Sequence, residues 1–292
     1  MTLTRRAVLA AALGALAAFG SFAAPPARAA DDNTLAAIKQ RGVLHVGVRG
    51  DAPGFSSIDL AANQPVGFEV DLARAIAQRL LGSPDKIEFT IVKSDNRVPL
   101  VQNGSIDFFL ATATITPDRL KRIDFSNVYY RAGQALLVKS GSPIHSYRDL
   151  DGKTVCSVQG STPEQTIRRL VPKANVVTFE TYPECLTGLR GGRVDAVTTD
   201  NTILQGYAAQ DPANLAVVGG LFTFEPYGAG IRLGNTSLQN AIDAAFADIK
   251  KSGEYDRLHQ KWFHGAVPPA IEAVFGMPAA TAAAKWQDQK PG

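Results

Sequence analysis

The chain has 292 residues, which is long for one domain and sufficient for two. Its 45% hydrophobic and 20% charged residues are ordinary for a globular protein and exclude a disordered chain, a collagen and a polytopic membrane protein. A net charge of +3 is too mild an excess to indicate a nucleic-acid partner. Two cysteines are too few for a disulfide-rich scaffold or a four-cysteine zinc site.

Residues 1–29 have the pattern of a secretory signal peptide. Arg5 and Arg6 precede an alanine-rich apolar run over residues 7–24, and Pro25-Pro26-Ala27-Arg28-Ala29 supplies a cleavage site. A membrane anchor is the alternative, but so short an alanine-rich run inserts weakly. The arginine pair fits a twin-arginine signal or a general secretory one. We therefore expect a periplasmic or otherwise extracytoplasmic protein.

Export places the two cysteines in an oxidising compartment. Cys156 and Cys185 can then form a disulfide that closes a loop of about 29 residues and contributes about 3.5 kcal/mol of stability. The alternative is two buried free thiols.

Helix and strand signals alternate along the first part of the mature chain. This alternation predicts a mostly parallel sheet with helices on both faces. The predicted elements, in chain order, are a helix over 35–40, a strand over 43–48, a helix over 68–81, a strand over 87–92, a helix over 98–102 and a strand over 106–111.

A second alternating unit begins near residue 150, and extended stretches over 134–139 and 226–231 flank it. We expect these stretches to cross between two lobes and form a hinge. The predicted elements of the unit are strands over 153–158, 175–179 and 194–198 and helices over 163–171, 183–190 and 201–209.

The sequence thus predicts an α/β fold of two lobes with parallel-dominated sheets. The first lobe comprises residues 30–135 and 225–265, with helices over 238–251 and 255–263, and the second is the insertion 136–224. Residues 266–292, rich in alanine and proline, are expected to form a loosely ordered tail. Ligands of such folds bind outside the carboxyl ends of the strands, which here would face one cleft.

Polar and charged residues follow the predicted strands. Thr116 with Pro117 and Thr162 with Pro163 fit helix starts, and Gln165 would complete a capping box with Thr162. Each start could hold a carboxylate or only cap its helix. The other candidates at the strand ends are Arg49, Phe55, Arg97, Ala111, Thr112, Thr114, Arg119, Gly160, Ser161 and Asp200.

Several of these candidates have two interpretations. Arg119 lies where the helix dipole disfavours a cation, so it either holds an anion or pairs with Asp118 or Asp124. Asp200 either receives an ammonium group or caps the next helix. Phe55 either stacks on a ligand or lies in the core, and both Arg49 and Arg97 could be surface arginines.

The motifs of this chain resemble those of family 3 of the bacterial extracellular solute-binding proteins, the polar amino-acid-binding components of ABC importers. The resemblance covers residues 33–264 and implies a two-lobe periplasmic-binding-protein fold, type II-like, that closes on its ligand. The motifs are Gly67-Phe68-Glu69-Val70-Asp71-Leu72, residues 111–119, Ile123-Asp124-Phe125-Ser126, Tyr129-Tyr130 and Val158-Gln159-Gly160-Ser161-Thr162.

The resemblance also implies roles for the strand-end residues. Arg119 would clamp the ligand's α-carboxylate, assisted by Thr114, the Thr112 backbone and the Gly160-Ser161-Thr162 turn, while Asp200 would take the α-ammonium. Phe55 would cover the ligand, and Ala111 and Tyr182 complete the expected binding set. Some members carry a lysine or arginine where this chain has Val158 and Gln159, which removes one side-chain contact.

Arg49 and Arg97 suggest the ligand. The segment over 95–104 is similar to that of glutamate- and aspartate-binding members, where the arginine at Arg97 meets a side-chain carboxylate. Three arginines and one aspartate give the expected pocket a charge of +2, and an unpaired buried charge costs several kcal/mol, so an acidic amino acid is favoured. Glutamate and aspartate differ by one methylene, which is worth only about 1–3 kcal/mol of binding free energy. The sequence therefore indicates glutamate, aspartate or both, with a preference for glutamate.

The alternatives are a binder of glutamine or another polar amino acid, a dehydratase-like enzyme and a sensor module. An enzyme needs an acid or base near the reacting atom, and none of the four histidines follows a predicted strand. We expect no enzymatic activity, no cofactor, no metal and no nucleic-acid partner. The expected partners are an amino acid and the permease of an importer, and the protein is expected to be a monomer.

Overall fold

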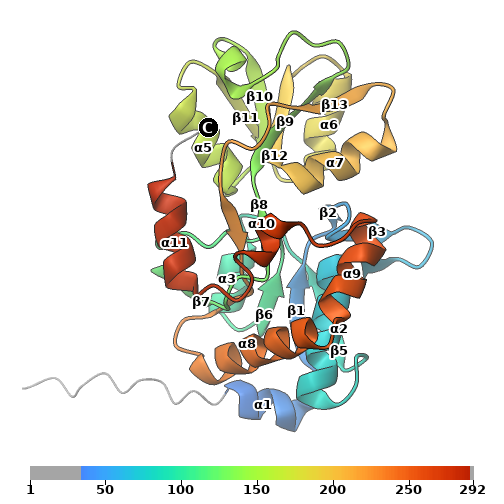
Figure 1. The fold of residues 1–292 in the computed structure, drawn as a ribbon, viewed down its shortest axis with the longest axis vertical. Coiled ribbons are helices and arrows are strands. Elements are labelled where there is room, and N and C mark those ends of the chain that lie inside the picture. Colours follow the sequence, from blue (N-terminus) through green and yellow to red (C-terminus); the bar gives the residue numbers. More distant parts are fainter. Residues whose placement is uncertain (1–33, 290–292) are drawn as a thin grey trace, which may run out of the picture. The chain divides into compact units, whose positions relative to one another are not determined.

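The computed structural model describes residues 34–289 (Figure 1). The predicted signal peptide lies outside these residues. Within them no helix combines the length and apolar character needed to span a membrane. The chain forms two α/β lobes, each built on a five-stranded sheet, as the sequence predicts.

The first sheet has four strands in one direction and one strand, β15, against them. Helices α2 and α8 pack against each other beside it. The strands, in sheet order, are β5 (Ile87–Ile91), β1 (Leu44–Val48), β6 (Phe108–Leu110), β15 (Gly230–Arg232) and β7 (Ile123–Phe125). The helices are α1 (Thr34–Arg41), α2 (Phe68–Leu81), α3 (Arg97–Gln102), α4 (Pro117–Leu120), α8 (Thr236–Lys251) and α9 (Glu254–Phe263).

The second sheet repeats this arrangement, with β9 as the strand that runs against the others. The strands, in sheet order, are β11 (Asn175–Phe179), β10 (Thr154–Val158), β12 (Ala196–Asp200), β9 (Gln134–Lys139) and β13 (Leu215–Val218). The helices are α5 (Thr162–Leu170), α6 (Tyr182–Arg190), α7 (Asn201–Gln210) and the 3-10 helix η1 (Tyr147–Leu150).

Two short antiparallel strands, β8 (Tyr130–Ala132) and β14 (Glu225–Tyr227), connect the lobes. The prediction of two connecting strands is confirmed, and their positions are corrected in part. The stretch 134–139 is strand β9 of the second sheet. The stretch 226–231 begins in the connecting strand β14 and ends in β15 of the first sheet. Both stretches are extended and apolar, so only their pairing partners distinguish a sheet strand from a crossing strand.

A small antiparallel sheet follows β1 and was not predicted. Its strands are β2 (Asp51–Ala52), β3 (Ser56–Asp59) and β4 (Gln64–Val66). Gly67 then leads into α2 with φ of 147°, and a Cβ there would lie 2.1 Å from the Phe55 carbonyl oxygen. Only glycine allows this close approach, which fixes where α2 begins.

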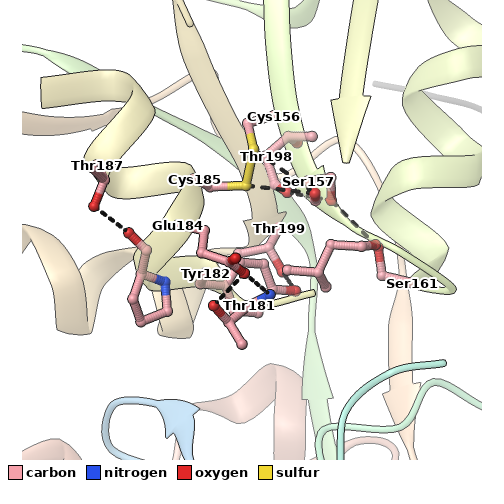
Figure 2. The surroundings of a disulfide bond; sticks show 12 residues. Cys156, Ser157, Ser161, Thr181, Tyr182, Glu184, Cys185, Thr187, Thr198 and Thr199 are labelled. Atoms are coloured by element: carbon pink, nitrogen blue, oxygen red, sulfur yellow. Dashed lines mark hydrogen bonds between the residues drawn. A yellow bond between two sulfur atoms is a disulfide. The ribbon is translucent and has the colours of Figure 1, made fainter. Parts of the chain in front are cut away.

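The predicted disulfide is present between Cys156 of β10 and Cys185 of α6 (Figure 2). Their Cα atoms are 5.6 Å apart, and both residues are fully buried. The bond therefore joins a strand to the helix beside it within the second lobe.

The C-terminal segment corrects the prediction of a loosely ordered tail. It contains α10 (Pro269–Glu272) and α11 (Ala279–Asp288). Ala282 and Ala283 are buried against the first lobe, and the Val128 N–H donates to the Met277 carbonyl at 2.9 Å. Alanine is small enough for close packing and has the highest helix propensity, which the composition alone did not reveal.

Candidate functional site

The carboxyl ends of strands from both lobes meet at a group of buried polar residues. Two contacts join the lobes there. The Arg119 guanidinium donates to the Gly160 carbonyl at 3.2 Å, and the hydroxyl oxygens of Thr114 and Thr162 lie 3.2 Å apart. The structure therefore brings the strand-end residues of both lobes to one place, as the fold class predicts.

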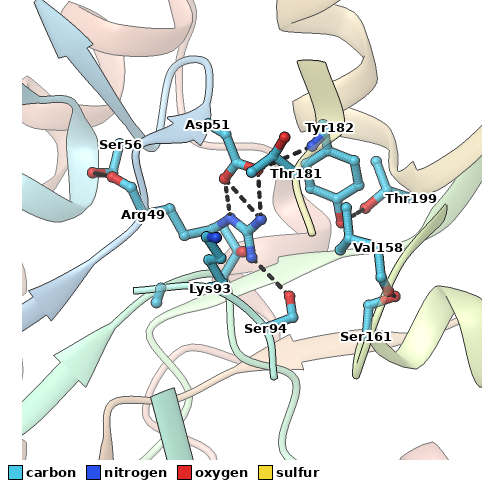
Figure 3. Close-up of polar contacts among 12 residues, drawn as sticks. Arg49, Asp51, Ser56, Lys93, Ser94, Val158, Ser161, Thr181, Tyr182 and Thr199 are labelled. Atoms are coloured by element: carbon cyan, nitrogen blue, oxygen red, sulfur yellow. Dashed lines mark hydrogen bonds and ion pairs between the residues drawn. The ribbon is translucent and has the colours of Figure 1, made fainter. Parts of the chain in front are cut away.

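Arg49, directly after β1, is fully buried rather than a surface arginine (Figure 3). Its guanidinium forms a bidentate pair with Asp51, at 2.8 and 3.0 Å, and also donates to Ser94 Oγ at 2.8 Å. Burial opposes its charge, but the adjacent Asp51 carboxylate holds the pKa of Arg49 above its ordinary value. The Arg49 charge thus already has a partner within the protein.

Tyr182, at the start of α6, packs against this pair. The Arg49 guanidinium lies over its ring, 5.1 Å from the centroid, and its backbone N–H donates to Asp51 at 3.1 Å. The Tyr182 hydroxyl lies 2.5 Å from Thr199 Oγ1. Tyr182 therefore links Arg49 of the first lobe to the second lobe.

Arg97 begins α3 and is also buried. One of its Nη atoms donates to the Ala111 carbonyl, and its Nε has no hydrogen-bond partner among the described residues. Burial, and then repulsion from Arg119 and Arg49, lower the pKa of Arg97 to about 9. Arg97 is thus a buried cation with an unused donor.

Arg119 lies in α4, whose N-terminus is capped as predicted by the Thr116 hydroxyl, which accepts from the Arg119 N–H at 3.2 Å. Its guanidinium donates to the Thr114 carbonyl at 2.7 Å and does not pair with its acidic neighbours. Asp118 instead pairs with Lys121. Burial lowers the pKa of Arg119, because carbonyls solvate a cation less well than water does.

The turn before α5 starts one residue earlier than predicted. Ser161, rather than Thr162, is the N-cap, and its hydroxyl accepts from the Glu164 N–H at 3.2 Å. Glu164, rather than Gln165, reaches back and accepts from the Gly160 N–H at 3.0 Å. The shift leaves the Thr162 hydroxyl free to point toward the first lobe, where it meets Thr114.

Asp200 ends β12 and stands at the N-cap position of α7, but its side chain makes no capping bond. One carboxylate oxygen accepts from the Tyr227 hydroxyl, and the other, Oδ1, has no partner among the described residues. Burial, and then the neighbouring Glu225, raise the pKa of Asp200 to about 7. The structure therefore favours the interpretation of Asp200 as an available carboxylate.

Phe55 lies in an aromatic cluster with no exposed surface. Its ring packs edge-on against Phe68, Tyr130, Tyr227 and Phe263. Of the two interpretations of Phe55, the structure supports the core residue.

Two buried glutamates belong to the group although they were not among the expected binding residues. Glu69 of α2 accepts from the Thr112 N–H at 2.7 Å and from the Tyr129 hydroxyl. The bond to its N–H holds Thr112 at a φ of 47°. Burial raises the pKa of Glu69 to about 7. The sequence did contain a sign that Glu69 is buried, because Glu69 stands between two apolar residues at the start of an apolar helix face.

Glu225 of β14 is the second, and it is fully buried. Its Oε2 accepts from the Thr114 hydroxyl at 2.7 Å and from the Thr162 hydroxyl at 2.9 Å. Burial raises its pKa. Glu225 therefore connects the hinge to both lobes.

These acids change the charge balance of the site. The three arginines face four carboxyls, Asp51, Glu69, Asp200 and Glu225, which gives 3 − 4 = −1 when all are ionised. Burial raises the pKa of Glu69, Asp200 and Glu225, so each proton that one of these carboxyls holds makes the charge of the site less negative. The expected charge of +2 counted only one acid, Asp200, so the argument for an acidic ligand left three carboxyls of the site out of account.

A separate cavity of about 660 Å³ lies at the hinge, with lining residues from both lobes. Tyr130, Thr202 and Trp262 line it, whereas Arg97, Arg119 and Asp200 do not. This cavity is therefore distinct from the site formed by the three arginines and the four carboxyls, which we call the charged group.

Two hinged α/β lobes that face each other through buried cations and carboxylates define a solute-binding protein of the periplasmic type. The chain belongs to the bacterial extracellular solute-binding proteins, family 3, whose model matches residues 44–265.

Individual relatives refine this assignment. The chain is 43% identical to the ABC transporter glutamine-binding protein GlnH of Bacillus subtilis, over 79% of this chain and 84% of the relative. It is 30% identical to the L-glutamate/L-aspartate-binding protein of Pseudomonas aeruginosa, over 81% and 82%. A solved ancestral arginine-binding protein bound to glutamine matches with a TM-score of 0.73 and 42% identity, over 77% of this chain and 99% of that one. The expected closeness to glutamate- and aspartate-binding members is not supported, because the glutamine-binding relative is the more similar of the two.

Proposed function

We propose that this protein binds L-glutamine between its lobes outside the cytoplasm and delivers it to the permease of an ABC importer. The observation that carries the proposal is the buried Arg49–Asp51 pair. Because Asp51 neutralises Arg49, the site does not need a second ligand carboxylate to compensate that charge. A ligand with one carboxylate, one ammonium and a neutral amide side chain is then sufficient.

The charged groups support an orientation for this ligand. Arg119, whose contacts within the protein are to carbonyls, would bind the α-carboxylate together with the Thr112 backbone and the Gly160-Ser161-Thr162 turn. Asp200, with a free Oδ1, would bind the α-ammonium. The side-chain amide would then extend toward Arg97, whose Nε can donate to an amide oxygen.

Relatives of this chain support the choice of ligand. The more similar of the two curated relatives is named as a glutamine-binding protein, and the ancestral structure holds glutamine. An acidic amino acid remains the second candidate, because the unused Nε of buried Arg97 would also suit a carboxylate. Neither ligand requires chemistry from the protein, which is consistent with a binding protein and not an enzyme.

Titration of the ligand-free mature protein tests the proposal. Calorimetry with Gln, Glu, Asp, Asn, His and Arg should give the tightest binding for Gln. Tighter binding of Glu or Asp would overturn the choice of ligand, and recovery of chemically altered glutamine after long incubation would reveal an enzyme.

Arg97→Ala sharpens the comparison. If the ligand is glutamine, the variant loses one hydrogen bond to a neutral amide, about 0.5–1.5 kcal/mol. An acidic ligand would lose a charge-assisted bond, so its affinity should fall far more than that of glutamine. Arg122→Ala, an arginine of the same lobe with no assigned role in the site, is the control.

A further inference from the structure

Glu225 makes contacts that no other carboxylate of the site makes. Its Oε2 accepts hydrogen bonds from Thr114 in the first lobe and from Thr162 in the second. The residue itself lies on hinge strand β14, so a single buried carboxylate connects the hinge and both lobes.

The two threonine hydroxyls are thereby fixed as acceptors. A hydroxyl has one proton to donate, and when Glu225 is ionised each of these hydroxyls donates it to the Glu225 carboxylate. The two hydroxyl oxygens lie 3.2 Å apart, and neither hydroxyl has a second proton to donate to the lone pairs of the other. Two such acceptors side by side repel each other unless a donor faces both of them.

The free Oδ1 of Asp200 adds a third acceptor, and the Glu225 carboxylate lies close enough to raise the pKa of Asp200. These oxygens together suit a cation that carries several N–H groups. An α-ammonium, with three donors and one positive charge, has this chemistry.

The other oxygen of Glu225 is contacted by the C-terminal segment. Trp286 of α11 donates from its indole Nε1 to Glu225 Oε1 at 3.4 Å, and the Gln289 side chain accepts from the Phe224 N–H. Helix α11 also packs against β14 and against α4, which carries Arg119. Residues 266–289 lie beyond the part of the chain that the family model matches.

We propose that Glu225 is a positioning residue that orients the Thr114 and Thr162 hydroxyls as acceptors for the ligand's α-ammonium, and that α11 supports it through Trp286. The inference rests on the proposed function and deepens it. It differs from the role expected from the family resemblance, in which Thr114 assists the carboxylate clamp. It also makes the C-terminal segment a part of the ligand-binding device.

Glu225→Gln tests the proposal because the amide has a similar shape but can donate to the threonines, which then turn their protons toward the ligand. Two ligands are compared by calorimetry. One is L-glutamine, and the other is its α-hydroxy analogue, in which a hydroxyl replaces the ammonium. Loss of one or two charge-assisted bonds should lower glutamine affinity by about 10- to 100-fold, and that of the analogue by about threefold or less.

Controls separate positioning from a general structural role. Trp286→Phe should lower glutamine affinity by about three- to tenfold while sparing the analogue, since it removes one weak hydrogen bond to a charged group. Trp262→Phe, which removes an indole that donates to Asp71 instead, should change neither affinity. Glu180→Gln, which removes an exposed carboxylate that bridges the lobes through Lys93, is the matched control for Glu225.

Each outcome has a distinct meaning. Equal losses for glutamine and the analogue in Glu225→Gln would overturn the positioning role, since a structural defect does not discriminate between them. If Trp286→Phe leaves the ratio of the affinities for glutamine and the analogue unchanged, the role of α11 would be overturned. Failure of the unaltered protein to bind glutamine would refute the proposed function itself.

Discussion

Arg49 and Asp51 form a bidentate ion pair in which the arginine side chain is 1% exposed and the aspartate side chain 11% exposed. The two residues are separated by one position, yet the pair is completed by the second lobe, since the Tyr182 N–H also donates to Asp51. The pair therefore has two consequences, one for charge selectivity and one for contact between the lobes.

Asp51→Asn should reverse part of the ligand preference. The amide keeps the shape of Asp51 but leaves the Arg49 charge without a partner. The ratio of the affinity for glutamate to the affinity for glutamine should therefore rise by about tenfold, which corresponds to about 1.4 kcal/mol of binding free energy. The free energy of unfolding should fall by about 3–5 kcal/mol, because one partner of a buried pair is removed. Calorimetric affinities and urea denaturation measure the two effects. Asp118→Asn, at an exposed pair with Lys121, should change neither quantity.

Gly160→Ala should weaken ligand binding more than it weakens the fold. Gly160 has φ of 75°, and an added Cβ would lie 3.0 Å from Asp95 Cα, a backbone atom of the other lobe. Glutamine affinity should fall by about tenfold or more, while the strain at positive φ lowers the free energy of unfolding by about 1–2 kcal/mol. Gly141→Ala has a similar φ of 79° with no atom within 4 Å, so it should show the strain alone. Equal affinity losses in the two variants would contradict this explanation.

The Cys156–Cys185 disulfide should stabilise the second lobe without contributing to selectivity. Replacing both cysteines by serine removes a cross-link over 29 positions, so the free energy of unfolding should fall by about 3–4 kcal/mol. The order of affinities for glutamine and glutamate should be unchanged, since neither sulfur touches the charged group. Chemical denaturation of the unaltered protein with and without reductant provides the comparison. An unchanged denaturation midpoint after reduction would show that the bond contributes no stability.

Local patterns predicted the elements well, because their causes lie within the elements. The helix expected over 68–81 is observed as Phe68–Leu81, since its apolar face repeats regularly and glycines stand at both ends. The capping of α4 by Thr116 is also a local interaction, and it was predicted. In the second lobe the competing serine at position 161 shifted the cap by one residue.

The ionic partners of the site could not be predicted in the same way. Glu225 contacts Thr114 and Thr162, which lie 111 and 63 positions away, so its role depends on tertiary structure. Glu69 lies 43 positions from Thr112. Without these partners the sequence indicated a strongly cationic pocket, and the acidic ligand was inferred from an incomplete count of the charges.

The stability of the ligand-free protein should fall as the pH rises from about 5 to 7.5. Burial raises the pKa of Glu69 to about 7, so the folded protein holds a proton that the unfolded chain has released. The contribution of such a group to the free energy of unfolding is fully present below the pKa that the group has in the unfolded chain. It is lost as the pH rises through the pKa that the group has in the folded protein. The loss should be on the order of 2–3 kcal/mol for this residue. Glu69→Gln, which stays neutral, should remove this part of the pH dependence in urea denaturation.

Glutamine binding should show the opposite dependence on pH. An α-ammonium requires an ionised Asp200, whose pKa burial raises to about 7 in the ligand-free protein. Below pH 7 the ligand must displace a proton, so the association constant should fall by up to about tenfold per pH unit, and binding should release protons. Above pH 7 the affinity should level off.

Calorimetry at pH 6 and pH 8, in buffers with different ionisation enthalpies, measures the number of protons released. Asp200→Asn should bind glutamine weakly at both pH values, because the amide has no charge to offer the ammonium and no proton to release. If the unaltered protein instead binds glutamine equally well at pH 6 and pH 8 without proton release, then Asp200 is ionised before the ligand arrives. The unpaired Oδ1 would in that case need a partner other than the ligand's ammonium.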